Sequence, residues 1–128
     1  MGKGTLPTPE VERLRATLLT KLGLASNAAP SAVLYRIMER SEPCGDVTID
    51  APGFDLGNVF QKAGIVPGPT LYYWHGWDEI DTFDRMDLLM SIRLLWTSAA
   101  PDDVDVFDDT LGWLLTVDHT GQVGCIRF

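Results

Sequence analysis

Residues 104–126, VDVFDDTLGWLLTVDHTGQVGCI, decide the fold class because they predict neighbouring strands joined by tight turns. The adjacent aspartates Asp108 and Asp109 mark the first turn, and residues 111–118 are apolar enough for a central strand. Gly121 then stands where a three-residue hairpin connection favours a positive φ, which glycine adopts at low cost. The last quarter of the chain therefore predicts an antiparallel meander.

Upstream, apolar residues recur at helical spacing and predict helices over residues 8–22, 30–40 and 56–63. Proline and glycine at residues 67–69 break that pattern, and the aromatic run over residues 70–75 predicts a strand. After an acidic connection, one more helix is expected, with Asp84, Asp87 and Arg93 on its solvated side. Its apolar stripe comprises Phe83, Met86, Leu89, Met90 and Leu94.

These elements predict one α+β domain over residues 1–128, with a flexible tail at residues 1–7. We expect the N-terminal helices to pack on a small, mainly antiparallel sheet that ends in a C-terminal hairpin, and the helices to cover one face of that sheet. The size of 128 residues, with 45 % apolar and 22 % charged residues, suits a globular domain.

Location and redox state follow from what the chain lacks. No apolar run approaches the roughly 18 to 20 residues that span a bilayer, and residues 1–9 have no signal-peptide pattern. We therefore expect a cytoplasmic protein without a membrane partner. Cys44 and Cys125 match neither a zinc nor a thioredoxin spacing, and for the cytoplasm they predict two reduced thiols.

Acidic residues concentrate in the second half of the chain. Residues 78–118 hold eleven acids against Arg85 and Arg93, a net charge of −9, whereas residues 1–41 carry a net +3. The whole chain has a net charge of −8, which argues against nucleic acid as a partner because nucleic-acid binding depends on phosphate neutralisation.

Three interpretations of these acids stay open. They are turn residues, helix caps and solubilising charge, or a surface for a basic partner, or hard oxygen ligands for a metal ion. The metal interpretation rests on two clusters, Asp78, Glu79 and Asp81, and Asp102, Asp103 and Asp105, but neither has the glycine and glutamate frame of a calcium loop.

The run Tyr72–Trp77 lies directly before the first acidic cluster. It is either buried between the sheet and a helix or partly exposed as an aromatic anchor with a charged rim. The sequence favours a non-enzymatic protein without a cofactor, because it has no nucleophile elbow, phosphate-binding loop or zinc-protease motif. His75 and His119 are the only histidines.

The segment DVFDDTLGWLLTVDHTG, residues 105–121, resembles the C-terminal strand–turn–strand of small acidic bacterial immunity proteins of polymorphic toxin systems. The similarity covers mainly residues 104–126. It implies a cytoplasmic, non-catalytic protein that blocks a toxin by binding it.

The sequence thus predicts an immunity- or antitoxin-type inhibitor of a basic effector protein, acting as a monomer or homodimer. The alternative is a metal-binding hydrolase or regulatory domain that uses the aspartate clusters. The expected partner-binding residues are Trp77, Asp78, Glu79, Asp81, Asp84, Asp102, Asp103 and Asp105.

Overall fold

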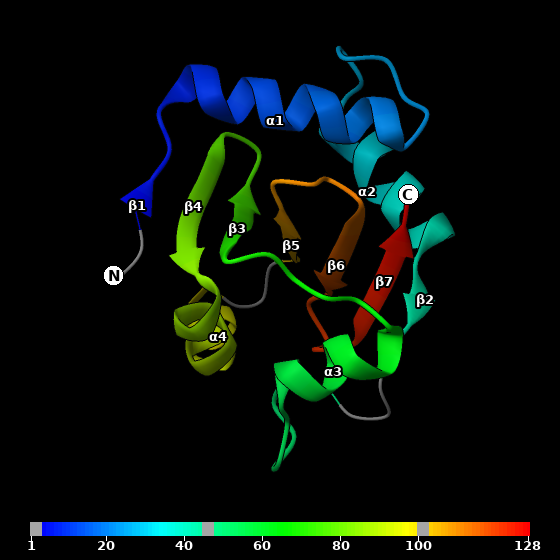
Figure 1. Ribbon diagram of the computed structural model, residues 1–128. Coiled ribbons are helices and arrows are strands. Elements are labelled where there is room, and N and C mark those ends of the chain that lie inside the picture. Colours follow the sequence, from blue (N-terminus) through cyan, green and yellow to red (C-terminus); the bar gives the residue numbers. More distant parts are fainter. Residues whose placement is uncertain (1–3, 45–47, 100–102) are drawn as a thin grey trace.

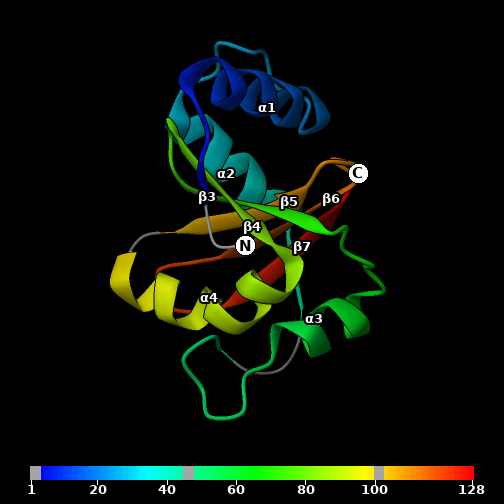
Figure 2. The same ribbon diagram turned by 60° about the vertical axis from the view of Figure 1, so that its left-hand side comes forward.

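The computed structural model describes residues 4–44, 48–99 and 103–128, and these form a seven-stranded antiparallel sheet with two helices on each face (Figures 1 and 2). The strands are β1 Gly4–Thr5, β2 Glu42–Pro43, β3 Thr70–Gly76, β4 Glu79–Asp84, β5 Val104–Asp108, β6 Trp113–Val117 and β7 Val123–Arg127. The helices are α1 Thr8–Lys21, α2 Pro30–Arg40, α3 Leu56–Ala63 and α4 Arg85–Ala99. The strand order across the sheet is β1-β4-β3-β5-β6-β7-β2.

The predicted α+β domain and its C-terminal hairpin are confirmed. The helices α1, α2 and α3 begin and end within a residue of their expected bounds, and α3 is closed by Gly64 at a φ of 70°. The hairpin between β6 and β7 turns through Gly121, whose φ of 90° is the positive value that the sequence predicts there. At the N-terminus, Gly4 and Thr5 pair with β4, in a stretch for which the sequence predicts a tail.

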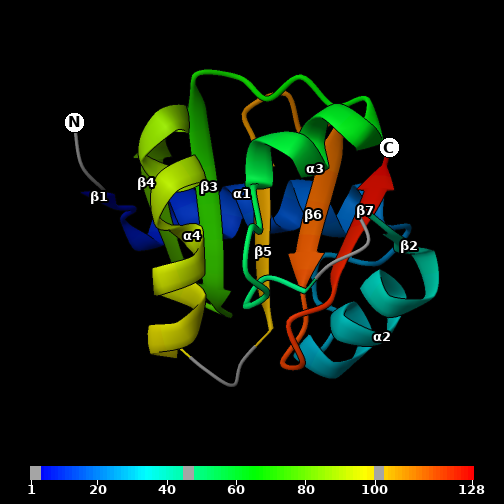
Figure 3. The same ribbon diagram turned by 90° about the horizontal axis from the view of Figure 1, so that it is seen from below.

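The expectation that the helices cover one face of the sheet is wrong. The helices α1 and α2 pack on one face, and α3 and α4 pack on the other, so the molecule has three layers (Figures 2 and 3). Successive strand residues point to opposite faces. In β3, Trp74 joins the core beneath α1 and α2, whereas Leu71 and Tyr73 join the core against α3 and α4. Both faces of the central strands are therefore apolar.

The acidic connection before the last helix is in fact the strand β4, and Phe83, expected in the helix, lies in this strand. The stripe predicted for α4 is wrong as well. Leu88, Ile92 and Trp96 are its buried residues, and Met86, Met90 and Leu94 are exposed. Since α4 is apolar on two sides, its periodicity fits two helical registers, and only packing against the sheet selects between them.

Cys44 and Cys125 form a disulfide, with their Cα atoms 5.9 Å apart, so the prediction of two reduced thiols is wrong. The bond ties the segment after the edge strand β2 to β7, the strand with which β2 pairs. Because disulfides persist in oxidising compartments, the cysteines lend no support to a cytoplasmic location. Within the described residues, no helix has the length and apolar character needed to cross a membrane.

Candidate protein-binding site

A groove follows α2 where this helix lies over the ends of β5, β6 and β7. It consists of two adjoining cavities of about 230 and 140 Å³ that share Leu34, Ile37 and Asp103. We call it the α2 groove. Besides the shared residues, its lining includes Met38, Trp74, Trp77, Asp105, Thr116, Asp118 and Gly124.

One wall of the α2 groove is apolar because α2 carries more apolar residues than the sheet can cover. Val33 and Ile37 are buried against the sheet, whereas Leu34 is 41 % exposed and Met38 is 61 % exposed. At helical spacing, all four fall on one apolar stripe of the helix. The apolar residues of this eleven-residue helix form two adjacent rows, which is a wider apolar face than contact with the sheet alone requires. The width of this apolar face is the feature of the sequence that could have predicted the exposed wall.

The opposite wall is acidic, and Asp105 is its most unusual member. It lies opposite Trp74 on β3 and Thr116 on β6, so its side chain points to the face that α2 covers. The pKa of Asp105 is raised to about 7, chiefly because the carboxyl group is buried; a hydrogen bond from the Thr116 hydroxyl lowers the pKa, and the negative charge of Asp103 raises it. Its Oδ1 is sealed from solvent and accepts no hydrogen bond from any described residue.

The other two acidic residues of the groove, Asp103 and Asp118, already have polar partners within the protein. Asp103 Oδ1 lies 3.4 Å from His119 Nδ1. The carboxylate of Asp118 accepts hydrogen bonds from the backbone N–H groups of Thr120 and Gln122 and from the Thr120 hydroxyl. Partial burial acts to raise the pKa of Asp118, but these hydrogen bonds outweigh it and the pKa is lowered. Asp118 therefore organises the β6–β7 turn, and Asp105 is the groove acid with unused hydrogen-bonding capacity.

Trp77 closes one end of the α2 groove and is held there by α1. The Arg15 guanidinium lies 4.6 Å from the centre of the Trp77 ring, and Nη1 donates to the Trp77 carbonyl at 2.7 Å. The same nitrogen donates to Asp78 Oδ1 at 2.8 Å. Trp74 Nε1 donates to the Trp77 carbonyl at 3.3 Å. The β3–β4 turn is thereby fixed, and the charge of Asp78 is paired with Arg15.

The predicted acidic residues that follow Trp77 do not form one surface; they are Asp78, Glu79, Asp81 and Asp84. Asp81 is buried, with Oδ2 3.2 Å from His75 Nε2 and Oδ1 accepting a hydrogen bond from the Thr5 hydroxyl. Glu79 is exposed and lies 3.8 Å from His75 Nδ1, and Asp84 is exposed at the end of β4. Of the predicted residues, the structure brings together Trp77, Asp103 and Asp105 in the α2 groove. Asp102 lies outside the described residues.

In the part of the chain that the structure describes, no group of three His, Cys, Asp or Glu side chains is placed so that it could hold a metal ion. In the first aspartate cluster, Asp78 is paired with Arg15, whereas Asp81 lies against His75 and accepts a hydrogen bond from Thr5.

No protein-family model matches the chain, and neither a curated protein nor a solved structure matches it. The lining of the α2 groove itself indicates what it can bind. An apolar wall facing a half-buried carboxylate suits a long aliphatic side chain that ends in a cation, which is the shape of lysine and arginine.

Proposed function

We propose that this protein is a non-enzymatic binding protein that takes a basic segment of a partner protein into the α2 groove, as an immunity-type inhibitor of a basic effector would. The observation that carries the proposal is the buried Oδ1 of Asp105, which has no hydrogen-bond partner among the described residues. A buried polar atom without a partner is costly, so a donor supplied by a partner would remove that cost.

The charge of Asp105 points to a cationic donor. With its pKa raised to about 7, the carboxyl group is partly protonated near neutrality. An ammonium or guanidinium placed beside it would favour the ionised form and would form a charge-assisted hydrogen bond. Arginine suits this site because its planar fork can bond to a carboxylate through two nitrogens at once.

The apolar wall supplies the rest of the affinity. Leu34 and Met38 are exposed next to Asp103 and Asp105, so an apolar residue of the partner can bury against them while the cation reaches the carboxylates. Methionine adapts its shape to a bound surface and is common where proteins bind partners. The net charge of −8 would in addition speed the encounter with a basic protein.

The test is a pull-down from lysate with the tagged chain, at low salt and at about 0.5 M salt, which screens exposed charges. Three versions are compared: the natural sequence, Asp103→Asn with Asp105→Asn, and Glu12→Gln with Asp109→Asn. The last pair removes the same charge from exposed positions outside the groove. We expect one basic protein that the natural sequence and the control pair retain at low salt and that the groove pair loses.

The proposal fails if the groove pair retains the same protein as strongly as the natural sequence does. It also fails if both pairs weaken retention equally, because the partner would then respond to overall charge and not to the α2 groove. Circular dichroism of each version shows that the substituted chains are folded.

A further inference from the structure

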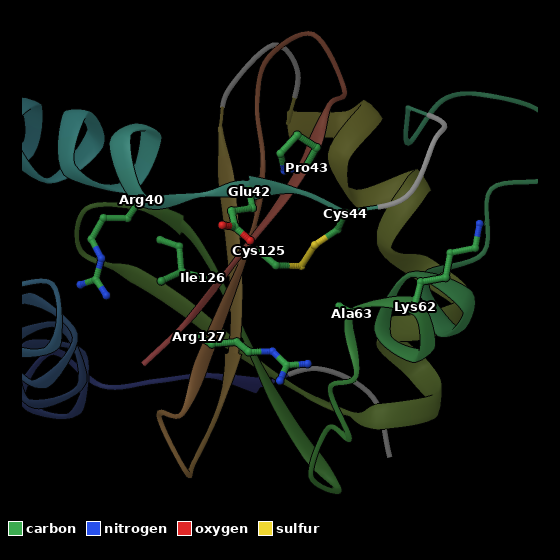
Figure 4. Close-up of a pocket in the computed structure, with 9 residues that line it drawn as sticks. All are labelled: Arg40, Glu42, Pro43, Cys44, Lys62, Ala63, Cys125, Ile126 and Arg127. Carbon is green, nitrogen blue, oxygen red and sulfur yellow. A yellow bond between two sulfur atoms is a disulfide. The ribbon is translucent and has the colours of Figure 1, made fainter.

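A second cavity, of about 510 Å³, lies between α3 and the edge formed by β7 and β2, on the other side of β2 from the α2 groove (Figure 4). We call it the α3 cavity. Pro43 lines both the cavity and the groove. The volume lies in the range of sites that hold small molecules. No acidic residue of the α2 groove lines this cavity, so the cavity lies outside the site proposed for the basic partner.

Cationic side chains predominate in its lining. Arg40, Lys62 and Arg127 line the cavity together with one acid, Glu42. Arg40 comes from the end of α2, Lys62 from the last turn of α3, and Arg127 from the last position of β7. The chain has a net charge of −8, whereas the lining of this cavity has three cations and one carboxylate. The Arg40 guanidinium turns toward α1, where it donates to the Lys21 carbonyl at 3.0 Å. Such a cavity selects an anionic ligand.

Arg127 is held in place by its fit against the end of α3. A Cβ added to Gly64 would stand 2.5 Å from Arg127 Nη2, so the guanidinium occupies the space that a side chain at this position would need. The positive φ of 70° at Gly64 also favours glycine. The C-terminal end of a helix attracts cations, which further holds the guanidinium at the rim of the cavity.

The wall of the α3 cavity also contains the disulfide Cys44–Cys125. In Figure 4 the two sulfur atoms lie between the β2 edge and Ala63 of α3, on the cavity side of the strand. Cys125 and Arg127 are two residues apart on β7, so their side chains point to the same face of the sheet. The disulfide and a fixed cation therefore share one cavity.

We propose that the α3 cavity binds a small thiol that carries carboxylates, and that this thiol exchanges with the Cys44–Cys125 disulfide. The cations attract the carboxylates and bring the thiolate to the bond, and they also stabilise the cysteine thiolate that leaves. The disulfide distinguishes this ligand from other anions, because a phosphate or a simple carboxylate could not react with the sulfur atoms. The proposal does not rest on the function proposed for the α2 groove.

The exchange proceeds in two balanced steps. The thiolate of the first ligand attacks Cys44 Sγ, the Cys44–Cys125 bond breaks, and Cys125 leaves as a thiolate on the face that carries Arg127. A second ligand thiolate then attacks the ligand sulfur of the mixed disulfide, and Cys44 leaves as a thiolate. Both cysteines take protons from water. Two ligand thiols are oxidised to one ligand disulfide, and the protein disulfide is reduced to two thiols.

The experiment measures the rate at which three thiols reduce the disulfide of the full chain: reduced glutathione, which is anionic, 2-mercaptoethanol, which is neutral, and cysteamine, which is cationic. Alkylation at timed intervals and mass spectrometry report the fraction reduced. Each rate is divided by the rate for the same thiol on the urea-unfolded chain, which removes differences in thiol reactivity. We expect the native-to-unfolded ratio for glutathione to exceed that for cysteamine by about tenfold.

Arg127→Gln should remove most of this preference and leave the ratio for 2-mercaptoethanol unchanged. Arg13→Gln is the matched control, because it removes an exposed arginine of α1 that pairs with Glu10 away from the cavity. Equal ratios for the three thiols would overturn the proposal. So would an equal effect of Arg127→Gln on all three, since the arginine would then act through structure and not through charge. Two alkylated cysteines in the untreated chain would also overturn it.

Discussion

Two aspartates on β5 show how differently the molecule uses the same side chain. Asp108 is buried, and its carboxylate accepts four hydrogen bonds. The donors are the backbone N–H groups of Gly68 and Thr110, the Thr110 hydroxyl and Trp113 Nε1. Asp105, three residues earlier, has the hydrogen bond from Thr116 and a buried Oδ1 that no described residue contacts as a donor.

The difference separates a structural carboxylate from a candidate binding carboxylate. Asp108 points to the α3 side of the sheet, where it joins the β5–β6 turn to the loop before β3. Asp105 points to the α2 side and lines the groove. Both aspartates have buried carboxylate oxygens, although Asp105 as a whole is only half-buried, so burial by itself does not mark a functional residue. What marks Asp105 is burial without a full set of hydrogen bonds, a state that a partner can relieve.

The largest expected effect is that of removing the satisfied carboxylate. Asp108→Ala leaves Trp113 Nε1 and the Gly68 N–H buried without an acceptor, and we expect a loss of about 4 kcal/mol in the free energy of unfolding. Urea denaturation followed by tryptophan fluorescence measures it. Asp109→Ala changes the exposed neighbour and should stay within about 0.5 kcal/mol. Equal losses from the two substitutions would show that the hydrogen bonds to Asp108 contribute little.

The next effect concerns the titration of Asp105. Burial raises its pKa in the folded protein to about 7, from an ordinary 3.8. Between these values the unfolded chain has released a proton that the folded chain keeps. The stability from protonated Asp105 is therefore fully present below about pH 4 and is lost as the pH rises toward 7, by about 4 kcal/mol in all and by about 3 kcal/mol between pH 5 and pH 8. Urea denaturation at pH 5 and at pH 8 measures the change.

Asp105→Asn isolates this effect, because an amide keeps the shape and does not titrate. The free energy of unfolding of the natural chain should fall relative to that of the variant between pH 5 and pH 8. At pH 8 the variant should be the more stable of the two. A difference that does not vary with pH would mean that Asp105 titrates at an ordinary value and is open to solvent.

Much of the fold follows from local sequence patterns. Helical spacing of apolar residues predicts α1, α2 and α3. The apolar strand pattern and the turn at Gly121 predict the stretch from β5 to β7. The failures share one cause, which is that contacts distant in sequence decide the outcome. Met90 is apolar and periodic like Leu88, yet it is exposed because the sheet contacts the other side of α4. The same holds for Cys44 and Cys125, which pairing between β2 and β7 brings together.

The sequence predicts individual residues of the candidate site but not how they are grouped. Trp77, Asp103 and Asp105 belong to the acidic and aromatic clusters that the sequence singles out. Their grouping depends on the register that places Asp105 opposite Trp74, which no local pattern reveals. Asp81 stands in a similar acidic run, but strand alternation turns it toward His75 and away from the α2 groove.

A smaller effect should appear in the affinity for the basic protein that the natural sequence retains. A cation bound beside Asp105 requires the ionised carboxylate, so binding must first displace a proton below pH 7. We expect the dissociation constant to fall about tenfold from pH 6 to pH 8. Isothermal titration calorimetry at both pH values measures this, with Asp105→Asn as the chain in which the dependence is absent. A natural chain that binds equally well at both pH values would contradict a cation at Asp105.

The smallest expected effect compares two exposed apolar side chains on different helices. Leu34→Ser removes part of the apolar wall of the α2 groove, whereas Met90→Ser alters α4 on the opposite face of the sheet, where the side chain is 82 % exposed. Both changes should leave stability within about 0.5 kcal/mol, because both residues are at the surface. Leu34→Ser should weaken binding of the basic partner about fivefold, through the apolar area it removes, and Met90→Ser should not change it. The reverse outcome in the same calorimetric assay would place the partner on α4, and the unpartnered oxygen of Asp105 would then need an explanation other than binding.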